Sequence, residues 1–131
     1  MKELCRQAGV ADKFEIDSAA VSREEIGNDI YPPAKRKLRE RDIPFESHAA
    51  RQITRADYDY YNYIICADRS NVRWLERIIG EDKDQKVSLM MAWASKGERE
   101  DVADPWYTGD FEAAYQDIDQ SCKAILKQLI K

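Results

Sequence analysis

The sequence predicts an α/β fold, with helices packed on both faces of a mostly parallel sheet. One observation is the apolar run YIICA at residues 63–67, because a continuous apolar run is typical of a strand buried on both faces. Another is that strand-like and helical segments alternate along the chain, an order that implies βαβ crossovers. The stretch 110–130 also repeats its apolar residues at helical spacing. We therefore expect a three-layer α/β/α arrangement around a central parallel sheet.

The first half of the chain predicts three short elements. Residues 1–9 (MKELCRQAG) have helical spacing and stop at Gly9, a common helix end. FEIDSAA at residues 14–20 alternates in the way that a short strand does. Residues 32–42 (PPAKRKLRERD) fit a helix entered through two prolines, whose basic face we expect to be solvated.

The second half predicts the clearer elements. Thr54 caps a short helix ahead of the strand at 63–67, and DRSNVRWLERIIG (68–80) is a helix ended by its glycine. VSLMMAW (87–93) is a further short strand, and residues 110–130 form the long C-terminal helix. The apolar stripe predicted for that helix consists of Phe111, Ala114, Tyr115, Ile118, Cys122, Ile125 and Leu129.

Composition narrows the class of protein. The 131 residues suit one domain, and a chain that is 35% charged and 44% hydrophobic is typical of a folded protein. The net charge of −4 argues against nucleic acid as the main partner. No apolar run has the length of a membrane span, and the N-terminus has no apolar core of a signal peptide. We expect no membrane partner and a cytoplasmic location.

Cysteine and histidine limit the chemistry. Cys5, Cys66 and Cys122 are widely spaced and suit reduced thiols that are buried as small apolar residues. Their spacing does not resemble a metal site, and His48 is the only histidine. The single histidine leaves almost no material for histidine-based triads and histidine-rich metal sites.

The stretch DPWYTGD at residues 104–110 has two interpretations. Pro105 biases Asp104 toward extended geometry, outside any helix. Trp106 and Tyr107 on a loop would expose apolar surface unless they line something. The stretch is either an ordinary helix-entry turn with two core aromatics or a presented acid beside an aromatic wall.

Several segments together resemble the low-molecular-weight protein tyrosine phosphatase family. They are FEIDSAA, IGNDIYPPAKRKL, SHAARQIT, DYDYYNYIICADRSNVRWL and DVADPWYTGDFEAAY, in that order over nearly the whole chain. The resemblance implies a phosphotyrosine phosphatase I-like fold with a parallel sheet of four strands. It also implies hydrolysis of phosphotyrosine proteins or aryl phosphates through a cysteinyl-phosphate, without a metal or other cofactor.

The resemblance gives roles to five residues. Asp104 matches the family's general acid, which protonates the leaving phenolate and then acts as base on the hydrolytic water. Trp106 and Tyr107 match the wall that receives the substrate ring. Ser18 and His48 match residues that support the phosphate loop. A simple turn residue explains Ser18 equally well, and we expect His48 to be a structural hydrogen-bonding residue rather than a catalyst.

One departure concerns the nucleophile. The family uses a loop of the form Cys, five residues, Arg, then Ser or Thr, directly after its first strand. In this chain the sixth residue after each cysteine is Ala11, Val72 or Gln128, so the motif is absent. Arg73 in CADRSNVR is one position too far. We expect residues 1–131 to be a single N-terminally truncated domain that lacks the first strand and is inactive.

Alternatives stay open at this point. A short paralogue could have kept the scaffold as a non-catalytic interaction module, although the apparently intact acid loop favours truncation. An arsenate-reductase-like relative would need a close pair of redox cysteines, which is not visible. In the family the first strand lies between those at 14–20 and 63–67. Without it, we expect a marginally stable chain, a rearranged sheet, or self-association through unpaired strands.

Overall fold

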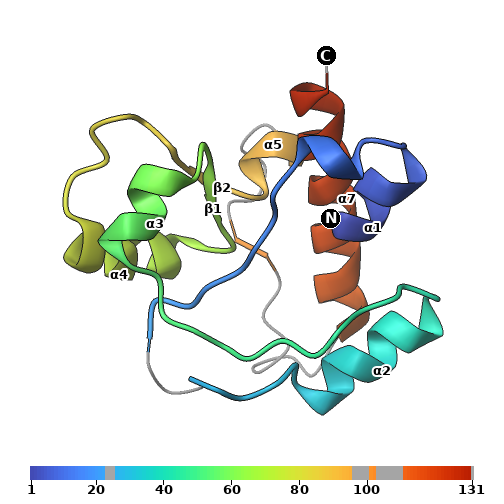
Figure 1. The fold of residues 1–131 in the computed structure, drawn as a ribbon. Helices are drawn as coiled ribbons and strands as arrows, with labels where there is room; N and C mark the ends of the chain where they lie inside the picture. The colour runs from blue at the N-terminus through green and yellow to red at the C-terminus, as the bar shows by residue number, and fades with distance from the viewer. Residues whose placement is uncertain (23–25, 96–100, 103–110, 131) are drawn as a thin grey trace.

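A computed structural model of the chain describes residues 1–22, 26–95, 101–102 and 111–130 (Figure 1). Helices dominate this part of the chain, with a small sheet near the middle. In chain order the elements are α1 (Lys2–Gln7), the 3₁₀ helix η1 (Ala11–Lys13), α2 (Pro32–Glu40), α3 (Arg55–Tyr60), β1 (Ile64–Cys66), α4 (Arg69–Ile79), β2 (Val87–Leu89), α5 (Ala92–Ser95) and α7 (Phe111–Leu129). None of these helices is long and apolar enough to cross a membrane.

The sheet pairs β1 with β2 in parallel, as predicted. Ile64 lies opposite Val87 and Cys66 opposite Leu89. The ladder is extended at both ends, since the Ile64 N–H donates to the Lys86 carbonyl at 2.9 Å and the Met90 N–H to the Cys66 carbonyl at 2.8 Å. The connection between the strands is α4, so this unit is the βαβ crossover that the sequence predicts.

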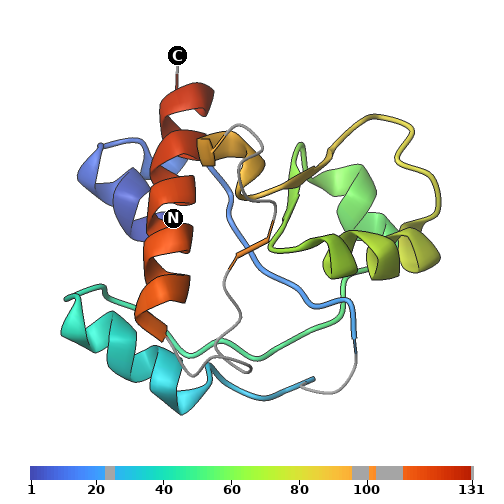
Figure 2. The ribbon, with the colours of Figure 1, turned by 180° about the vertical axis from the view of Figure 1, so that it is seen from behind.

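Helices lie on two sides of the sheet (Figures 1 and 2). On one side, α4 contacts both strands and α3 packs on α4. On the other side, α7 runs the height of the molecule and contacts α1, α2 and α5. The prediction of a parallel α/β fold is confirmed, whereas the three-layer arrangement and the missing first strand stay predictions.

The core next to α4 explains why these elements form. Tyr58 of α3, Cys66 of β1, and Leu75 and Ile79 of α4 are buried in one cluster. Reciprocal capping boxes start both helices, Thr54 with Asp57 on α3 and Asp68 with Asn71 on α4. Gly80 ends α4 at a φ of 76°, a conformation that favours glycine.

Two predicted strands are wrong in extent. Residues 14–20 form only an isolated parallel bridge between Ala20 and Gln52, because the segment finds a backbone ladder partner at that residue alone. The strand predicted over 87–93 ends at Leu89, and Ala92–Ser95 are helical. Alanine, methionine and tryptophan allow either state, so tertiary packing decides between them.

The apolar stripe predicted on α7 is shifted. Ile118 is 42% exposed, whereas Asp117 and Ser121 are buried. Ser121 is accommodated because its hydroxyl donates to the Met91 sulfur at 3.3 Å. Ala114, Cys122 and Ile125 are buried as predicted.

Candidate functional site

The two predicted loop-supporting residues lie together. Ser18 Oγ and His48 Nε2 are 2.9 Å apart and share a hydrogen bond, although 30 positions separate them in the sequence. The extended segments that carry them are joined nearby, where the Ala20 N–H donates to the Arg51 carbonyl at 2.7 Å. The Ile53 N–H also donates a hydrogen bond to the Ala20 carbonyl at 2.8 Å.

Carboxylates fix this pair from both sides. Asp17 accepts from the Ser18 N–H at 2.8 Å, and that bond is the main cause that lowers the pKa of Asp17. The Asp29 carboxylate accepts from the His48 N–H at 2.8 Å, and that bond is the main cause of its lowered pKa. Arg51 joins Asp17 to the α3 cap, with its guanidinium 2.9 Å from Asp57. These contacts hold Ser18 and His48 as a preorganised polar pair.

The two described residues before the predicted acid loop lie at the end of β1. The Val102 N–H donates to the carbonyl of Ala67 at 3.0 Å, directly after that strand. Asp101 accepts from the Arg69 N–H at 3.0 Å, at the start of α4. Residues 101 and 102 therefore anchor the chain just before the loop. Asp104, Trp106 and Tyr107 lie outside the described residues, so their roles stay predictions.

The same loop is followed by α7, whose first residues are held by α2. The Phe111 ring lies 6.1 Å from that of Tyr31. Glu112 pairs with Lys37 at 2.7 Å and also with Arg41. These bonds, with the one from Lys37 as the largest cause, lower the pKa of Glu112 to about 2. The basic face of α2, which we expected to be solvated, therefore holds the start of α7 through these ion pairs.

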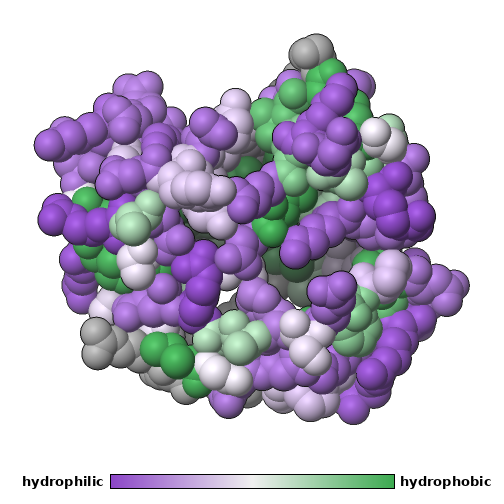
Figure 3. Space-filling view, in the orientation of Figure 1, coloured by the Kyte–Doolittle hydropathy of each residue, from purple (hydrophilic) through white to green (hydrophobic). Residues whose placement is uncertain are grey.

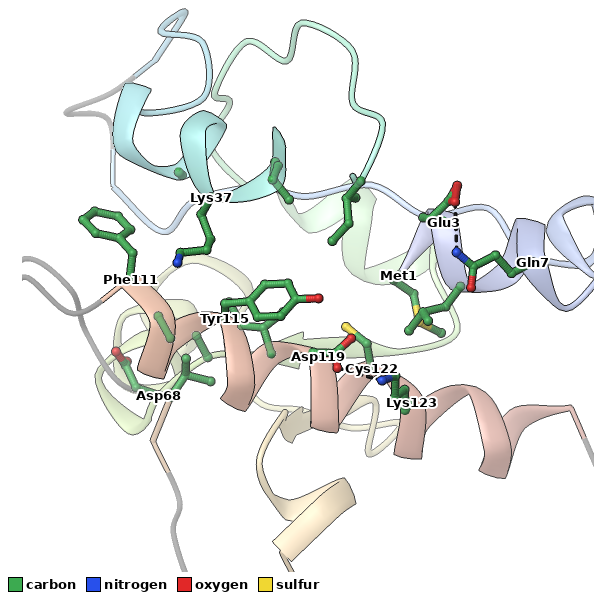
Figure 4. A pocket seen from close by; sticks show the side chains of 18 residues that line it. Met1, Glu3, Gln7, Lys37, Asp68, Phe111, Tyr115, Asp119, Cys122 and Lys123 are labelled. Atoms are coloured by element: carbon green, nitrogen blue, oxygen red, sulfur yellow. Dashed lines mark hydrogen bonds and ion pairs between the residues drawn. The ribbon is translucent and has the colours of Figure 1, made fainter. Parts of the chain in front are cut away.

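A large cavity lies between α1, α2 and α7. Its volume is about 650 Å³, and Figure 3 shows a hollow beside apolar surface on this side of the molecule. Figure 4 shows Lys37 and Tyr115 pointing into the space between α2 and α7. Both lysines of the lining are paired with carboxylates, Lys37 with Glu112 and Lys123 with Asp119. The lining is therefore better suited to apolar groups than to a phosphate.

A smaller cavity of about 360 Å³ meets the first at Ala67, which lines both. It separates residues 19–22 from β1. In open parallel sheets, ligands bind outside the carboxyl ends of the strands. The carboxyl end of β1, where Ala67, Asp68 and the residue before the acid loop converge, is therefore the candidate site.

None of the three cysteines has the surroundings of a nucleophile. Cys5, Cys66 and Cys122 are all buried and free, as the sequence predicts. Burial raises the pKa of Cys66 to about 11 and also raises that of Cys5. A nucleophilic cysteine instead needs a lowered pKa and an exposed sulfur.

Sequence reasoning missed the anchors on both sides of the acid loop. The sequence assigns no anchoring role to either Asp101 or Glu112. Their partners lie 32 positions away for Asp101 and 75 for Glu112 with Lys37. Local sequence patterns do not predict contacts between residues that are so distant in the sequence.

Comparisons with known proteins agree on one family. The sequence profile described as "Low molecular weight phosphotyrosine protein phosphatase" matches residues 1–131. The chain is 30% identical to the low molecular weight protein-tyrosine-phosphatase YfkJ of Bacillus subtilis, over 99% of this chain and 83% of the relative. It is 34% identical to the low molecular weight phosphotyrosine protein phosphatase of Rattus norvegicus, over 97% of this chain and 82% of that one. The YfkJ crystal structure superposes with a TM-score of 0.92, over 98% of this chain and 80% of that one.

Proposed function

Because the chain belongs to the low molecular weight phosphotyrosine protein phosphatase family, we propose that Asp104 is the general acid for phosphotyrosine hydrolysis. The observation that carries the proposal is the Asp-Pro pair at 104–105, placed just before α7 in a family match that spans the whole chain. The anchoring of residues 101 and 102 at the carboxyl end of β1 supports it, because that edge is where such sheets bind ligands.

The chemistry needs an acid at this point. A thiolate attacks the phosphorus, the bond from phosphorus to the phenolic oxygen breaks, and Asp104 gives its proton to that oxygen. Asp104, now a carboxylate, then takes a proton from the water that hydrolyses the cysteinyl-phosphate. Without the proton, the tyrosine phenolate is a poor leaving group.

The neighbouring residues have matching roles in this proposal. Trp106 and Tyr107 form the wall for the substrate ring, since flat aromatic surfaces stack on a phenyl group. Ser18 and His48 support the phosphate loop through the hydrogen bond that joins them. Phosphotyrosine proteins and aryl phosphates are the substrates. The free thiols of all three cysteines support a cytoplasmic location.

We propose that the nucleophile is not among residues 1–131 and that this chain alone is inactive. The motif of Cys, five residues and Arg is absent from the sequence, and the buried thiols of Cys5 and Cys66 have raised pKa values. The acid and its supports would act once a phosphate loop is present on the same scaffold.

A graft of the loop tests the role of Asp104. A chimera carries a strand and a Cys-X5-Arg-Ser loop ahead of Met1, and its turnover of p-nitrophenyl phosphate and phenyl phosphate is measured. In this chimera, Asp104→Asn should lower kcat by about 100-fold or more, with the larger loss for phenyl phosphate, whose leaving group needs the proton more.

The control for the graft is Asp110→Asn, which removes a nearby carboxylate that does not match the family's acid. Its kcat should stay within about threefold of the parent chimera. Equal losses for Asp104→Asn and Asp110→Asn, or equal losses on both substrates, would refute the assignment. An inactive parent chimera would count against the scaffold as a phosphatase.

A further inference from the structure

We propose that the exposed face of α4 binds an extended acidic segment of a partner protein, in which Arg73 and Arg77 pair with two glutamates and Trp74 packs beside them. The proposal goes beyond the phosphatase function and does not depend on it. It rests on the charge of this face, on the stacking of Arg77 on Trp74, and on the spacing of the two arginines along the helix.

The face is open because α4 packs on the sheet with its other side. Leu75 and Ile79 are buried, whereas Arg73, Trp74 and Arg77 are exposed, with 51% of Trp74 accessible. Figures 1 and 2 show α4 at the edge of the molecule that lies away from α7. Tryptophan and arginine are the residue types that are most enriched where proteins bind one another.

The charge of α4 is opposite to that of the chain. The helix carries three arginines and one carboxylate, Glu76, whereas the whole chain has 25 acidic and 21 basic residues. Arg69 is already paired with Asp101 at 3.6 Å. In the part of the chain that the structure describes, neither Arg73 nor Arg77 has a carboxylate partner. The two guanidinium groups are therefore available to carboxylates of a partner.

The stacking of Arg77 on Trp74 prepares this face for binding. The guanidinium carbon of Arg77 lies 4.6 Å from the centroid of the Trp74 ring, a cation–π contact that restricts both side chains. A stacked guanidinium keeps N–H groups at its edge, where a carboxylate can accept two of them. The exposed indole also offers an apolar surface to the methylene groups of a glutamate.

The spacing of Arg73 and Arg77 indicates the form of the occupant. Residues four positions apart lie on the same face of a helix, and at 1.5 Å per residue they are about 6 Å apart along its axis. In an extended chain, alternate side chains point to the same side and are about 6.6 Å apart. Glutamates at alternate positions of an extended segment therefore match the two arginines.

A nucleic acid fits this face less well than a short acidic segment. Glu81, Asp82 and Asp84 follow directly after Gly80, the end of α4, so a long polyanion along the helix would meet these carboxylates. The net charge of −4 repels a polyanion further. A segment with only two or three carboxylates avoids both costs.

A second copy of this chain is also less suitable. Glu15 and Asp17 are an alternating acidic pair outside the helices, but Tyr60 donates a hydrogen bond to Glu15, and Arg51 pairs with Asp17 at 3.1 Å. Docking of this pair on another copy would break both contacts. The occupant is therefore a segment of a different protein.

The probe is the blocked peptide acetyl-Ser-Gly-Glu-Ser-Glu-Gly-Ser-amide, which is titrated into the 131-residue chain. Binding is followed by NMR through the indole N–H of Trp74, a signal assigned by its loss in Trp74→Phe. We expect a saturable shift of this signal and weaker binding at high salt, because the ion pairs are exposed.

Two control peptides test the charge and the spacing. Replacement of both glutamates by glutamine should weaken binding by at least about fivefold. The isomer acetyl-Ser-Gly-Glu-Glu-Ser-Gly-Ser-amide has the same composition and charge, but its adjacent glutamates point to opposite sides of an extended chain. It should bind at least about twofold more weakly than the probe.

A matched pair of chain variants locates the site. The double variant Arg73→Gln and Arg77→Gln should weaken binding of the probe by at least about fivefold. The control, Arg36→Gln with Arg39→Gln, removes the same charge from α2, again with one arginine over an aromatic ring, since Arg39 lies 5.5 Å from the Phe45 centroid. It should change binding less than about twofold. The peptide controls decide the question on the unmodified chain if a variant does not fold.

Five outcomes would overturn the proposal. The probe does not bind, the glutamine peptide or the adjacent-glutamate isomer binds as well as the probe, or the two double variants lose equal affinity. An oligothymidylate of eight nucleotides that binds α4 more tightly than the probe would assign the face to nucleic acid. Self-association of the free chain that disappears in Arg73→Gln with Arg77→Gln would assign it to a second copy.

Discussion

The residue types that phosphotyrosine hydrolysis would require differ in how well their surroundings in this chain suit that reaction. Its carboxylates and polar pairs are well supported, as shown by Ser18 and His48 between Asp17 and Asp29. Its thiols lack the surroundings that a nucleophile needs, because burial makes Cys5 and Cys66 less acidic than an ordinary cysteine. The described polar pair is therefore held in place, whereas Cys5 and Cys66 do not have the acidity that a nucleophile needs.

Alkylation of Cys66 tests whether this thiol is buried and has a raised pKa. With a pKa of about 11, only about one thiol in a thousand is a thiolate at pH 8, and burial also blocks access. Iodoacetamide at pH 8 should modify Cys66 about 100-fold more slowly in the folded chain than in urea, as followed by peptide mapping. Equal rates in the two states would contradict the burial and the raised pKa of this thiol.

The Ser18–His48 bond can be measured by a double-mutant cycle. Ser18→Ala, His48→Phe and the double variant are compared in urea unfolding, and the coupling free energy should be about 0.5–1 kcal/mol. Because Glu46 forms no ion pair within the described part of the chain, a cycle of Ser18→Ala with Glu46→Gln should show no coupling. Additive effects in the Ser18–His48 cycle would show that the contact does not stabilise the fold.

Among the helices, the link between α2 and α7 fixes the position of the first turn of α7. Lys37 and Arg41 on α2 meet Glu112 in the first turn of α7. A carboxylate at that place is also favoured by the helix dipole. Residues 101 and 102 are thus held at the end of β1, and the first turn of α7 is held by a neighbouring helix.

The pH dependence of stability tests this link. Glu112 has a pKa lowered from 4.5 to about 2, so its stabilising contribution is complete above pH 4.5 and is lost as the pH falls through about 2. The wild-type chain should have a higher Tm than Glu112→Gln at pH 7, and this difference should shrink between pH 4.5 and 2. It should also shrink in high salt, because the pair is exposed.

The control for this experiment is Glu46→Gln, an exposed change without a described ion pair, which should show no such pH-dependent difference. A Tm difference for Glu112→Gln that is absent at pH 7 or constant down to pH 2 would refute the contribution of the ion pairs.

Local signals predicted elements well where a cap or period was complete. Thr54 and Gly80 mark the start of α3 and the end of α4, and both helices are found there. The strand expected at 14–20 fails because alternation indicates a strand only if a neighbour pairs with it, and Ala20 alone is paired in a bridge. The shifted stripe of α7 has a similar cause, since Ser121 is buried through a contact with Met91, 30 positions away.

Over the whole molecule, the order of the sequence segments predicted the fold and the family better than any single segment did. The α/β class, the parallel pair and the family were all predictable from sequence, because the alternation of elements and the order of motifs extend over the chain. The site was predictable only in part. Ser18 and His48, which the resemblance matches to loop-supporting residues, share a hydrogen bond, but their supporting role stays a prediction. The anchors at Asp101 and Glu112 depend on contacts that no local pattern encodes.

The molecule also combines a family match over its full length with the absence of a Cys-X5-Arg motif from the sequence. The catalytic account therefore depends on whether any cysteine of this chain can attack phosphorus. The polar supports would be of no help to a buried thiol.

Turnover of p-nitrophenyl phosphate by residues 1–131 tests directly whether any cysteine of this chain attacks phosphorus. The chain is compared with a variant in which Cys5, Cys66 and Cys122 are all replaced by alanine, each with and without vanadate. We expect the chain to show no vanadate-sensitive hydrolysis above that of the cysteine-free variant. Vanadate-sensitive turnover that disappears when one of the three cysteines is replaced would contradict it.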